Sequence, residues 1–240
     1  MNIEIKNVSK SFGKKQVLKN ISLNAIEGDM LCLLGPSGAG KTTIIRLITG
    51  AISADEGEIF IGGKRIPNME ILKHIGFMPQ SDALYTDISG YDNLLFFGRF
   101  FGLKGSALKK SAEKILSFVN LFEDKDKLVI NYSGGMKKRL SLAIALMHNP
   151  EVLVLDEPTV GIDPVLKKTI WDEFEDLRQK GTTLIISTHV MDEAEKCRMA
   201  ALIYDGRLIA FDEVKKLIDS SKSGKLEELF FTANKGGEGA

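Results

Sequence analysis

The sequence predicts an α/β fold: a mostly parallel sheet, an antiparallel β-subdomain beside it and an inserted helical subdomain. Three observations support this. Residues 30–34 and 152–155 are apolar runs of strand length, and residues 183–187 have an apolar centre, as expected for strands buried on both faces. The first run leads through a glycine-rich loop into a segment with a helical pattern. Residues 81–149 are helical in pattern and poor in β-branched strands.

The glycine-rich loop matches the phosphate-binding pattern G-x-x-x-x-G-K-[ST] and has the strand and helix that this pattern requires on either side. Its glycines let backbone N–H groups surround an anion, and the following helix adds the positive end of its dipole. Lys41 supplies a positive charge for the β- and γ-phosphates, and the Thr42 hydroxyl is a candidate Mg²⁺ ligand. The predicted nucleotide contacts in the loop are Gly35, Pro36, Ser37, Gly38, Ala39, Gly40, Lys41, Thr42 and Thr43.

Composition narrows the class of protein. The chain has 240 residues, which suits one domain with an inserted subdomain or two small domains. Its 32 Lys and Arg residues balance 32 Asp and Glu residues, so we expect no nucleic-acid partner. Cys32 and Cys197 are expected to be free thiols. We find no secretory signal and no apolar run of the roughly 18–20 residues that a membrane helix needs, so the chain is not expected to span a bilayer.

The first strands are expected to form the antiparallel subdomain. Residues 3–8 alternate between apolar and polar positions, and residues 17–23 form a second strand region. Phe12 lies at the polar turn between them. Two interpretations remain open for Phe12: its ring stacks on a nucleotide base, or it packs beneath its own turn.

Residues 75–79 form a short strand ending in proline. A polar residue, Gln80, and an aromatic-rich helix follow it. Gln80 could reach a metal ion or an attacking water, or could simply cap the loop. Residues 94–103 form a helix with more apolar side chains than one helix face should bury, so a partner helix could share them.

Two segments further along the chain contain candidate anion- or metal-binding residues. Ser133, Gly134 and Gly135 begin a helix, which makes them either a second anion site or an ordinary N-cap. Asp156 and Glu157 end a buried strand, the arrangement in which the first acid faces Mg²⁺ and the second faces the attacking water. The alternative for these two acids is capping of the next helix.

The remaining chain contributes one more candidate. His189 follows the strand at residues 183–187, at the end of a sheet where sites occur in open α/β folds. A polar linker occupies residues 219–224, one or two helical turns follow near residues 226–231, and disorder is expected from Asn234 to Ala240.

Together these elements resemble the ATP-binding cassette of ABC transporters over residues 1 to about 218. The resemblance implies a P-loop NTPase with a RecA-like core and its antiparallel β-subdomain at residues 1–80 and 150–218, and a helical signature subdomain at residues 81–149. Beyond it, residues 219–240 are expected to form a partly disordered extension. The residues with implied roles are Phe12 (adenine), residues 35–43 (Walker A), Gln80 (Q-loop), Ser133, Gly134 and Gly135 (signature), Asp156 and Glu157 (Walker B), Asp163 (D-loop) and His189 (switch). Glu157, His189 and Gln80 would be catalytic, and Thr42, Gln80 and Asp156 would hold Mg²⁺.

The motifs depart from the common family pattern at two places. The signature has Tyr132 and Met136 at its ends in place of the leucine and glutamine of LSGGQ, and the D-loop has Val160, Gly161 and Ile162 before Asp163 in place of SALD. Both variant motifs resemble those of the ABC-2 type exporters. The loss of the glutamine removes hydrogen bonds of the signature, while the serine and glycines that face phosphate remain.

The resemblance also implies partners and location. The family arrangement encloses each ATP between Walker A of one chain and the signature of a second cassette. We therefore expect ATP-dependent dimerisation of two cassettes, as a homodimer. Transmembrane permease subunits would dock on the surface after Gln80, near Asp82 and Tyr85, at the cytoplasmic face of the cell membrane. The alternatives are a soluble non-transport ABC ATPase, such as an iron–sulfur assembly type, and a non-catalytic ATP-gated interaction module. The sequence leaves the transported substrate open.

Overall fold

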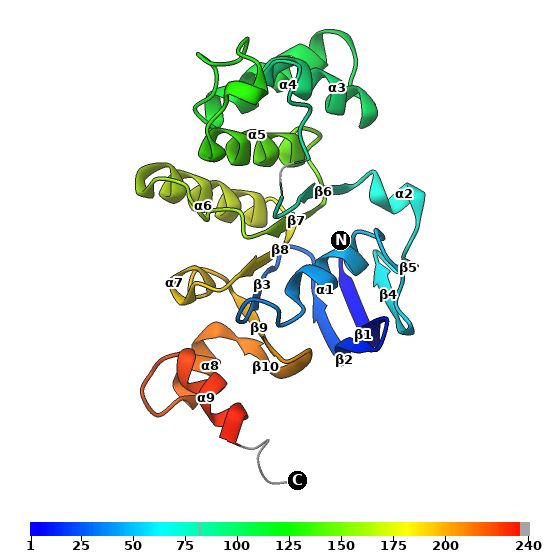
Figure 1. The fold of residues 1–240 in the computed structure, drawn as a ribbon, viewed down its shortest axis with the longest axis vertical. Helices are drawn as coiled ribbons and strands as arrows, with labels where there is room; N and C mark the ends of the chain where they lie inside the picture. The colour runs from blue at the N-terminus through cyan, green and yellow to red at the C-terminus, as the bar shows by residue number, and fades with distance from the viewer. Residues whose placement is uncertain (82, 236–240) are drawn as a thin grey trace.

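The fold is built on a six-stranded sheet with one antiparallel edge strand, and the α/β fold class is confirmed (Figure 1). The computed structural model describes residues 1–81 and 83–235. The sheet order is β10-β9-β3-β8-β7-β6, and only the pairing of β10 with β9 is antiparallel. Its strands are β3 (Met30–Leu34), β6 (Ile75–Met78), β7 (Val152–Asp156), β8 (Thr183–Thr188), β9 (Met199–Tyr204) and β10 (Arg207–Glu213).

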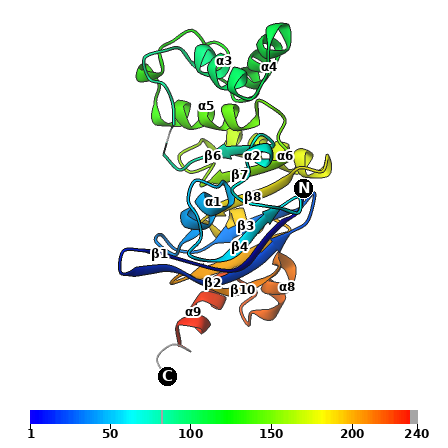
Figure 2. The same ribbon diagram turned by 90° about the vertical axis from the view of Figure 1, so that its right-hand side faces the viewer.

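A second sheet is antiparallel and lies beside the first (Figure 2). Its order is β2-β1-β4-β5, formed by β1 (Ile3–Phe12), β2 (Lys15–Ala25), β4 (Glu56–Ile61) and β5 (Lys64–Arg65). Helix α1 (Lys41–Ile48) packs between the sheets, because its isoleucines share one core with Leu31 and Leu33 of β3 and with Ile59 and Ile61 of β4. This packing fixes the start of α1 against the parallel sheet.

The opposite face of the parallel sheet packs on helix α6 (Pro164–Gln179). Alternate residues of β3, Met30, Cys32 and Leu34, contact this second core, which includes Trp171 and Phe174 of α6. Both faces of β3 are therefore buried, which is why its sequence is continuously apolar. Short helices α2 (Met69–Leu72) and α7 (Met191–Ala194) lie in the connections that precede β6 and β9.

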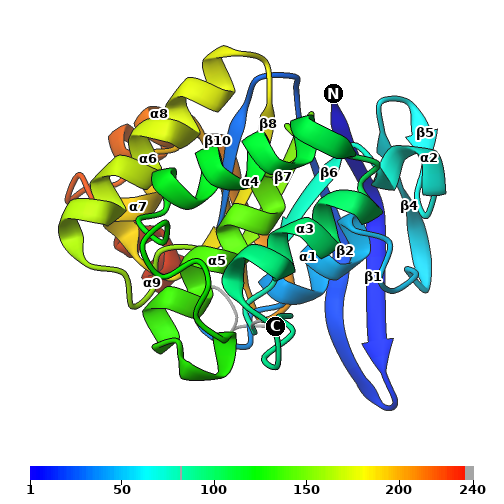
Figure 3. The same cartoon turned by 90° about the horizontal axis from the view of Figure 1, so that it is seen from above.

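Three longer helices gather at one end of the molecule (Figures 1 and 3). They are α3 (Gly90–Phe100), α4 (Gly105–Phe118) and α5 (Gly134–Leu146), with a short 3₁₀ helix, Val129–Asn131, before α5. They share a third core that contains Leu94, Leu116 and Leu140. The Ser89 hydroxyl accepts a hydrogen bond from the Asp92 N–H and so caps α3. The division of the chain into domains stays a prediction.

The C-terminal part lies at the other end of the molecule and contains helices α8 (Val214–Ser220) and α9 (Glu227–Lys235) (Figure 1). The expectation of disorder from Asn234 is wrong for its first two residues, because α9 continues to Lys235. The rest of that expectation, residues 236–240, lies outside the described residues. Cys32 and Cys197 are both free, as expected, and both are buried.

Candidate functional site

Four parallel strands bring the distant candidates to one edge of the sheet. The register pairs Leu34 with Thr188, Asp156 with Ser187 and Met78 with Leu155, so the strands end side by side. Gly35 follows β3, Glu157 follows β7 and His189 follows β8. Gln80 lies two residues after the end of β6. The carboxyl edge of a parallel sheet is where open α/β folds bind ligands.

The phosphate-binding loop needs two of its glycines for different reasons. Gly40 immediately precedes α1 with φ of 111°, a conformation that side chains other than glycine rarely adopt. At Gly35 an added Cβ would lie 2.2 Å from the carbonyl oxygen of Ile203 in β9, so no larger residue fits the closely packed backbones. These constraints place the loop directly over the N-terminus of α1.

Lys41 is folded back into this loop. Its side chain is buried, and Nζ donates to the carbonyl oxygens of Gly35 at 2.6 Å and Pro36 at 2.9 Å. Burial lowers the pKa of Lys41, and the nearby carboxylates of Glu157 and Asp156 oppose that shift. The ammonium group is therefore held at the place where the loop can surround an anion.

A pocket of about 300 Å³ opens at this loop. Apart from Val17, three kinds of group line it: loop residues, the Lys41 cation, and polar side chains from the start of α1 and from neighbouring strand ends. Such a combination suits a phosphate chain, which needs donors and positive charge at several points. The lining residues are Val17, Ser37, Gly38, Gly40, Lys41, Thr42, Thr43, Gln80 and Glu157.

The two acids after β7 occupy different environments. Asp156 is 2% exposed, and its Oδ1 accepts a hydrogen bond from the Ser187 hydroxyl. Glu157 turns out of the strand with φ of 52°, in the left-handed region. Its backbone N–H donates to the Ser187 hydroxyl at 3.1 Å. Ser187 therefore fixes both acids, which the apolar strand pattern alone did not reveal.

The side chain of Glu157 joins two other candidates. Its Oε1 lies 2.9 Å from Nδ1 of His189, and its Oε2 accepts a hydrogen bond from Nε2 of Gln80 at 3.3 Å. Gln80 and His189 lie 77 and 32 positions from Glu157 in the sequence, and both contact its carboxylate. This arrangement can hold a polar group, such as a water molecule, beside the phosphate pocket.

The residues expected to hold Mg²⁺ fit such an ion. Asp156, Thr42 and Gln80 offer carboxylate, hydroxyl and amide oxygens, the ligand type that Mg²⁺ prefers. Within residues 1–81 and 83–235, no group of three or more His, Cys, Asp or Glu residues could hold a metal ion. Since Mg²⁺ commonly combines one or two protein ligands with substrate phosphates, this small donor set suits it.

The signature residues lie elsewhere in the chain's fold. Ser133 is the N-cap of α5, and its hydroxyl accepts a hydrogen bond from the Met136 N–H at 3.2 Å. Asp163 likewise caps α6 through the Leu166 N–H at 3.0 Å. A Cβ built on Gly135 would lie 3.5 Å from the Gly161 carbonyl, so these two loops are neighbours. None of Ser133, Gly134, Gly135 and Asp163 lines the 300 Å³ pocket.

Phe12 lies at the end of β1, and its side chain is 46% exposed. The Lys10 ammonium lies 5.7 Å from the ring centroid. Phe12 does not line the phosphate pocket, and its exposure argues against packing beneath its own turn. Its stacking on a base stays a prediction.

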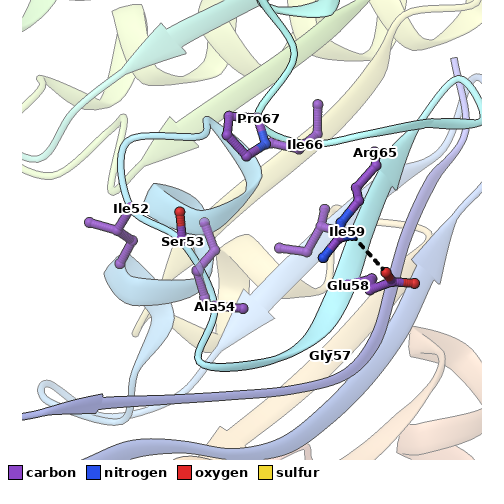
Figure 4. A pocket seen from close by; sticks show the side chains of 10 residues that line it. Ile52, Ser53, Ala54, Gly57, Glu58, Ile59, Arg65, Ile66 and Pro67 are labelled. Carbon is purple, nitrogen blue, oxygen red and sulfur yellow. Dashed lines mark ion pairs between the residues drawn. The ribbon is translucent and has the colours of Figure 1, made fainter.

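Two other hollows differ in character from the phosphate pocket. One, of about 400 Å³, lies against β4 and contains the ion pair between Arg65 and Glu58 at 3.1 Å (Figure 4). None of its lining residues is a predicted site residue. The other is an apolar groove of about 490 Å³ beside α3. Its aromatic lining, called the aromatic groove below, consists of Phe77, Tyr85, Phe96, Phe97, Phe100 and Phe101.

Comparisons with known proteins agree on one family. Residues 18–160 match the ABC transporter family. The chain is 39% identical to Nod factor export ATP-binding protein I of Paraburkholderia xenovorans (strain LB400), over 95% of this chain and 76% of that protein. It is also 39% identical to linearmycin resistance ATP-binding protein LnrL of Bacillus subtilis (strain 168), over 87% of this chain and 68% of that protein.

Solved structures show the same likeness. A dimeric ATP-binding cassette in a post-hydrolysis state, bound to ADP and Pi, superposes with a TM-score of 0.83 at 26% identity, covering 88% of this chain and 98% of that chain. An ATP-binding subunit of an ABC transporter has the same fold, with a TM-score of 0.88 at 23% identity, over 97% of this chain and 99% of that chain. Within the described part of the chain, every helix is too short or too polar to cross a membrane.

Proposed function

This chain belongs to the ABC transporter family of ATP-binding proteins, and on that premise we propose that it is the ATP-hydrolysing subunit of an ABC-2 type exporter. The observation that carries the proposal is the meeting of Gln80, Glu157 and His189 beside the Lys41 pocket. Its likeness to Nod factor export ATP-binding protein I supports export as the direction of transport. The two variant motifs, at the signature and the D-loop, support the ABC-2 assignment.

Each side chain of the site has its own role in ATP hydrolysis. The loop N–H groups and Lys41 bind the β- and γ-phosphates and neutralise their charge. Glu157 orients the attacking water and accepts its proton. His189 and Gln80 hold the Glu157 carboxylate from two sides, at 2.9 and 3.3 Å. A bound Mg²⁺, held by Thr42, Asp156 and Gln80, would stabilise negative charge on the phosphates.

A second copy of the chain would complete each site. The Ser133 helix end is an anion-binding element that the chain's own phosphate pocket does not include. A two-fold arrangement would place it against the phosphate pocket of the partner and create two equivalent sites from one surface. Adenine would stack on Phe12, and Asp163 would lie near the shared boundary. The dimeric state of a related cassette supports this arrangement.

The aromatic groove is the surface proposed for the permease. Phe96 is 46% exposed, Phe100 is 78% exposed and Tyr85 is 50% exposed, so apolar area is available beside the segment that follows Gln80. A helix of a transmembrane subunit could bury these rings. Asp82, expected at the same surface, lies outside the described residues. Docking there would hold the chain at the cytoplasmic face of the membrane as a peripheral subunit.

Purification of the tagged chain from detergent-solubilised membranes of its source cells tests the proposal. We expect an integral membrane protein to co-purify and to raise the rate of MgATP hydrolysis. Recovery with soluble partners alone would favour the iron–sulfur assembly type of ATPase. Absence of hydrolysis in every preparation would favour the non-catalytic interaction module.

A further inference from the structure

Glu193 in α7 is a charged residue buried among polar partners from three other segments. Its side chain is only 1% exposed. Oε1 accepts a hydrogen bond from the Thr159 hydroxyl at 2.7 Å and lies 2.5 Å from the Lys167 ammonium of α6. Oε2 accepts a hydrogen bond from the Thr188 hydroxyl at 2.6 Å. Both carboxylate oxygens are therefore bonded to groups fixed by the fold.

The two threonines connect this cluster to the catalytic edge. Thr159 follows Glu157 by two residues, and Thr188 immediately precedes His189. Thr159 is 2% exposed and Thr188 is fully buried, so neither hydroxyl can turn to water instead. One carboxylate thus bridges the two chain segments that carry Glu157 and His189.

The partners of Glu193 stabilise its ionised carboxylate. Burial alone would raise the pKa of Glu193, but hydrogen bonds from Lys167, Thr188 and Thr159 outweigh burial and lower that pKa. The carboxylate is therefore ionised at neutral pH. A buried charge with this many bonded partners resists displacement, because breaking one bond leaves a buried polar group unsatisfied.

The Glu157 segment needs such support. Glu157 has a left-handed backbone conformation, with φ of 52°, which is unfavourable for a residue with a side chain. His189 is partly exposed, with 44% of its side chain accessible, and its ring contacts Glu157 at 2.9 Å. The relative position of these two side chains consequently depends on how their backbones are held, and errors of about 1 Å at such sites can cost on the order of 10²-fold in rate.

We propose that Glu193 is a positioning residue for ATP hydrolysis. By accepting hydrogen bonds from Thr159 and Thr188 at the same time, it fixes the relative position of Glu157 and His189. It contacts neither the phosphate pocket nor Glu157 itself. Its loss should therefore change turnover while leaving nucleotide binding intact. This inference rests on the proposed function, since it requires that the chain hydrolyse ATP.

The test compares Glu193→Gln with Glu195→Gln. Both remove one negative charge near α7, but Glu195 is exposed. After wild-type hydrolysis has been established, we expect Glu193→Gln to lower kcat on the order of 10- to 100-fold with ATP Kd changed less than about threefold. Glu195→Gln should match the wild type. Thr159→Val, which removes one of the bonded hydroxyls, should give the same split between kcat and Kd.

A spectroscopic measurement separates positioning from general stability. The chain has three histidines, so ¹⁵N-imidazole spectra are simple to assign, with His189→Gln identifying the His189 signal. We expect that signal to shift in Glu193→Gln and in Thr159→Val, and to stay in place in Glu195→Gln. If Glu193→Gln does not fold, Thr159→Val decides the question alone. Unchanged kcat and His189 signal, or equal losses of kcat and ATP affinity, would overturn the proposal, whereas an inactive wild type would refute the proposed function instead.

Discussion

The Nδ1 atom of His189 lies 2.9 Å from Oε1 of Glu157, although the two residues follow different strands, β8 and β7. An ionised carboxylate can only accept hydrogen bonds, so the ring nitrogen is the donor when Glu157 is charged. Gln80 donates to the other carboxylate oxygen at 3.3 Å. The orientation of Glu157 is thus restricted by two side chains that follow neighbouring strands.

Replacing Glu157 with glutamine should separate binding from hydrolysis. The amide keeps the shape of the side chain but cannot accept a proton, so we expect kcat to fall about 10²- to 10⁴-fold while ATP Kd changes little. ATP should then persist between two chains, and size-exclusion chromatography with MgATP should show a dimer. Adding Ser133→Arg, which blocks the signature helix end, should abolish that dimer. Wild-type turnover in Glu157→Gln would contradict the catalytic role.

Removing the Lys41 ammonium should weaken ATP binding. Hydrogen bonds to charged groups contribute about 1.5–3 kcal/mol, so Lys41→Ala should raise ATP Kd roughly 10- to 150-fold. The variant also removes the Lys41 donor from the Gly35 carbonyl, whereas the Pro36 carbonyl keeps its bond from the Ala39 N–H at 3.2 Å. Isothermal titration measures the effect, with Lys14→Ala as a control at an exposed position. Equal affinities for wild type and Lys41→Ala would remove Lys41 from the phosphate site.

Phe12→Ala tests base stacking. An aromatic ring stacked on one base contributes about 1–3 kcal/mol by analogy with nucleic-acid binding, so ATP Kd should rise roughly 5- to 150-fold. The fold should be unaffected, because the ring is 46% exposed. Fluorescent-nucleotide titration and a thermal melt provide the two measurements. A lowered melting temperature with unchanged ATP affinity would show that Phe12 only packs.

Phe100→Glu tests the aromatic groove. Loss of a central aromatic anchor commonly costs about 2 kcal/mol or more, which corresponds to on the order of 30-fold in affinity. We expect co-purification of the membrane subunit to fall while ATP binding is retained. Phe231→Glu is a matched control, because Phe231 is 68% exposed and does not line the groove. Equal loss in both variants, or in neither, would argue against docking at this surface.

His148 makes folding stability depend on pH. Its ring stacks on Phe101 with centroids 3.8 Å apart, and burial lowers its pKa to about 4. The unfolded chain, with an ordinary histidine pKa of about 6.5, binds the proton more readily, so stability is lost as pH falls from about 6.5 toward 4.

The expected loss between about pH 7.5 and about pH 5 is on the order of 2 kcal/mol in the free energy of unfolding. His148→Phe keeps an aromatic ring against Phe101 and removes the titration. Urea unfolding at the two pH values should therefore show a smaller loss in the variant. His74→Asn serves as the control, because His74 is exposed and pairs with Glu151 at 2.9 Å. The same pH dependence in wild type and His148→Phe would contradict the assignment.

The sequence by itself determined the fold class and the individual candidate residues. Those features are local: a glycine-rich loop between strand and helix, an apolar run ending in Asp156 and Glu157, and a hydroxyl at the start of α5 are all visible in short windows. Strand burial on both faces likewise leaves a continuous apolar pattern, as in β3.

Only the tertiary structure decided which of these residues meet. The contacts of Glu157 with Gln80 and His189 depend on the parallel register of β6, β7 and β8, which joins segments far apart in the chain. The burial of Glu193 with Thr159 and Thr188 was equally invisible, because a glutamate in a short charged helix has the pattern of a solvated surface residue. Periodicity records which face of an element is buried, whereas the partners of a buried charge are set by packing between elements.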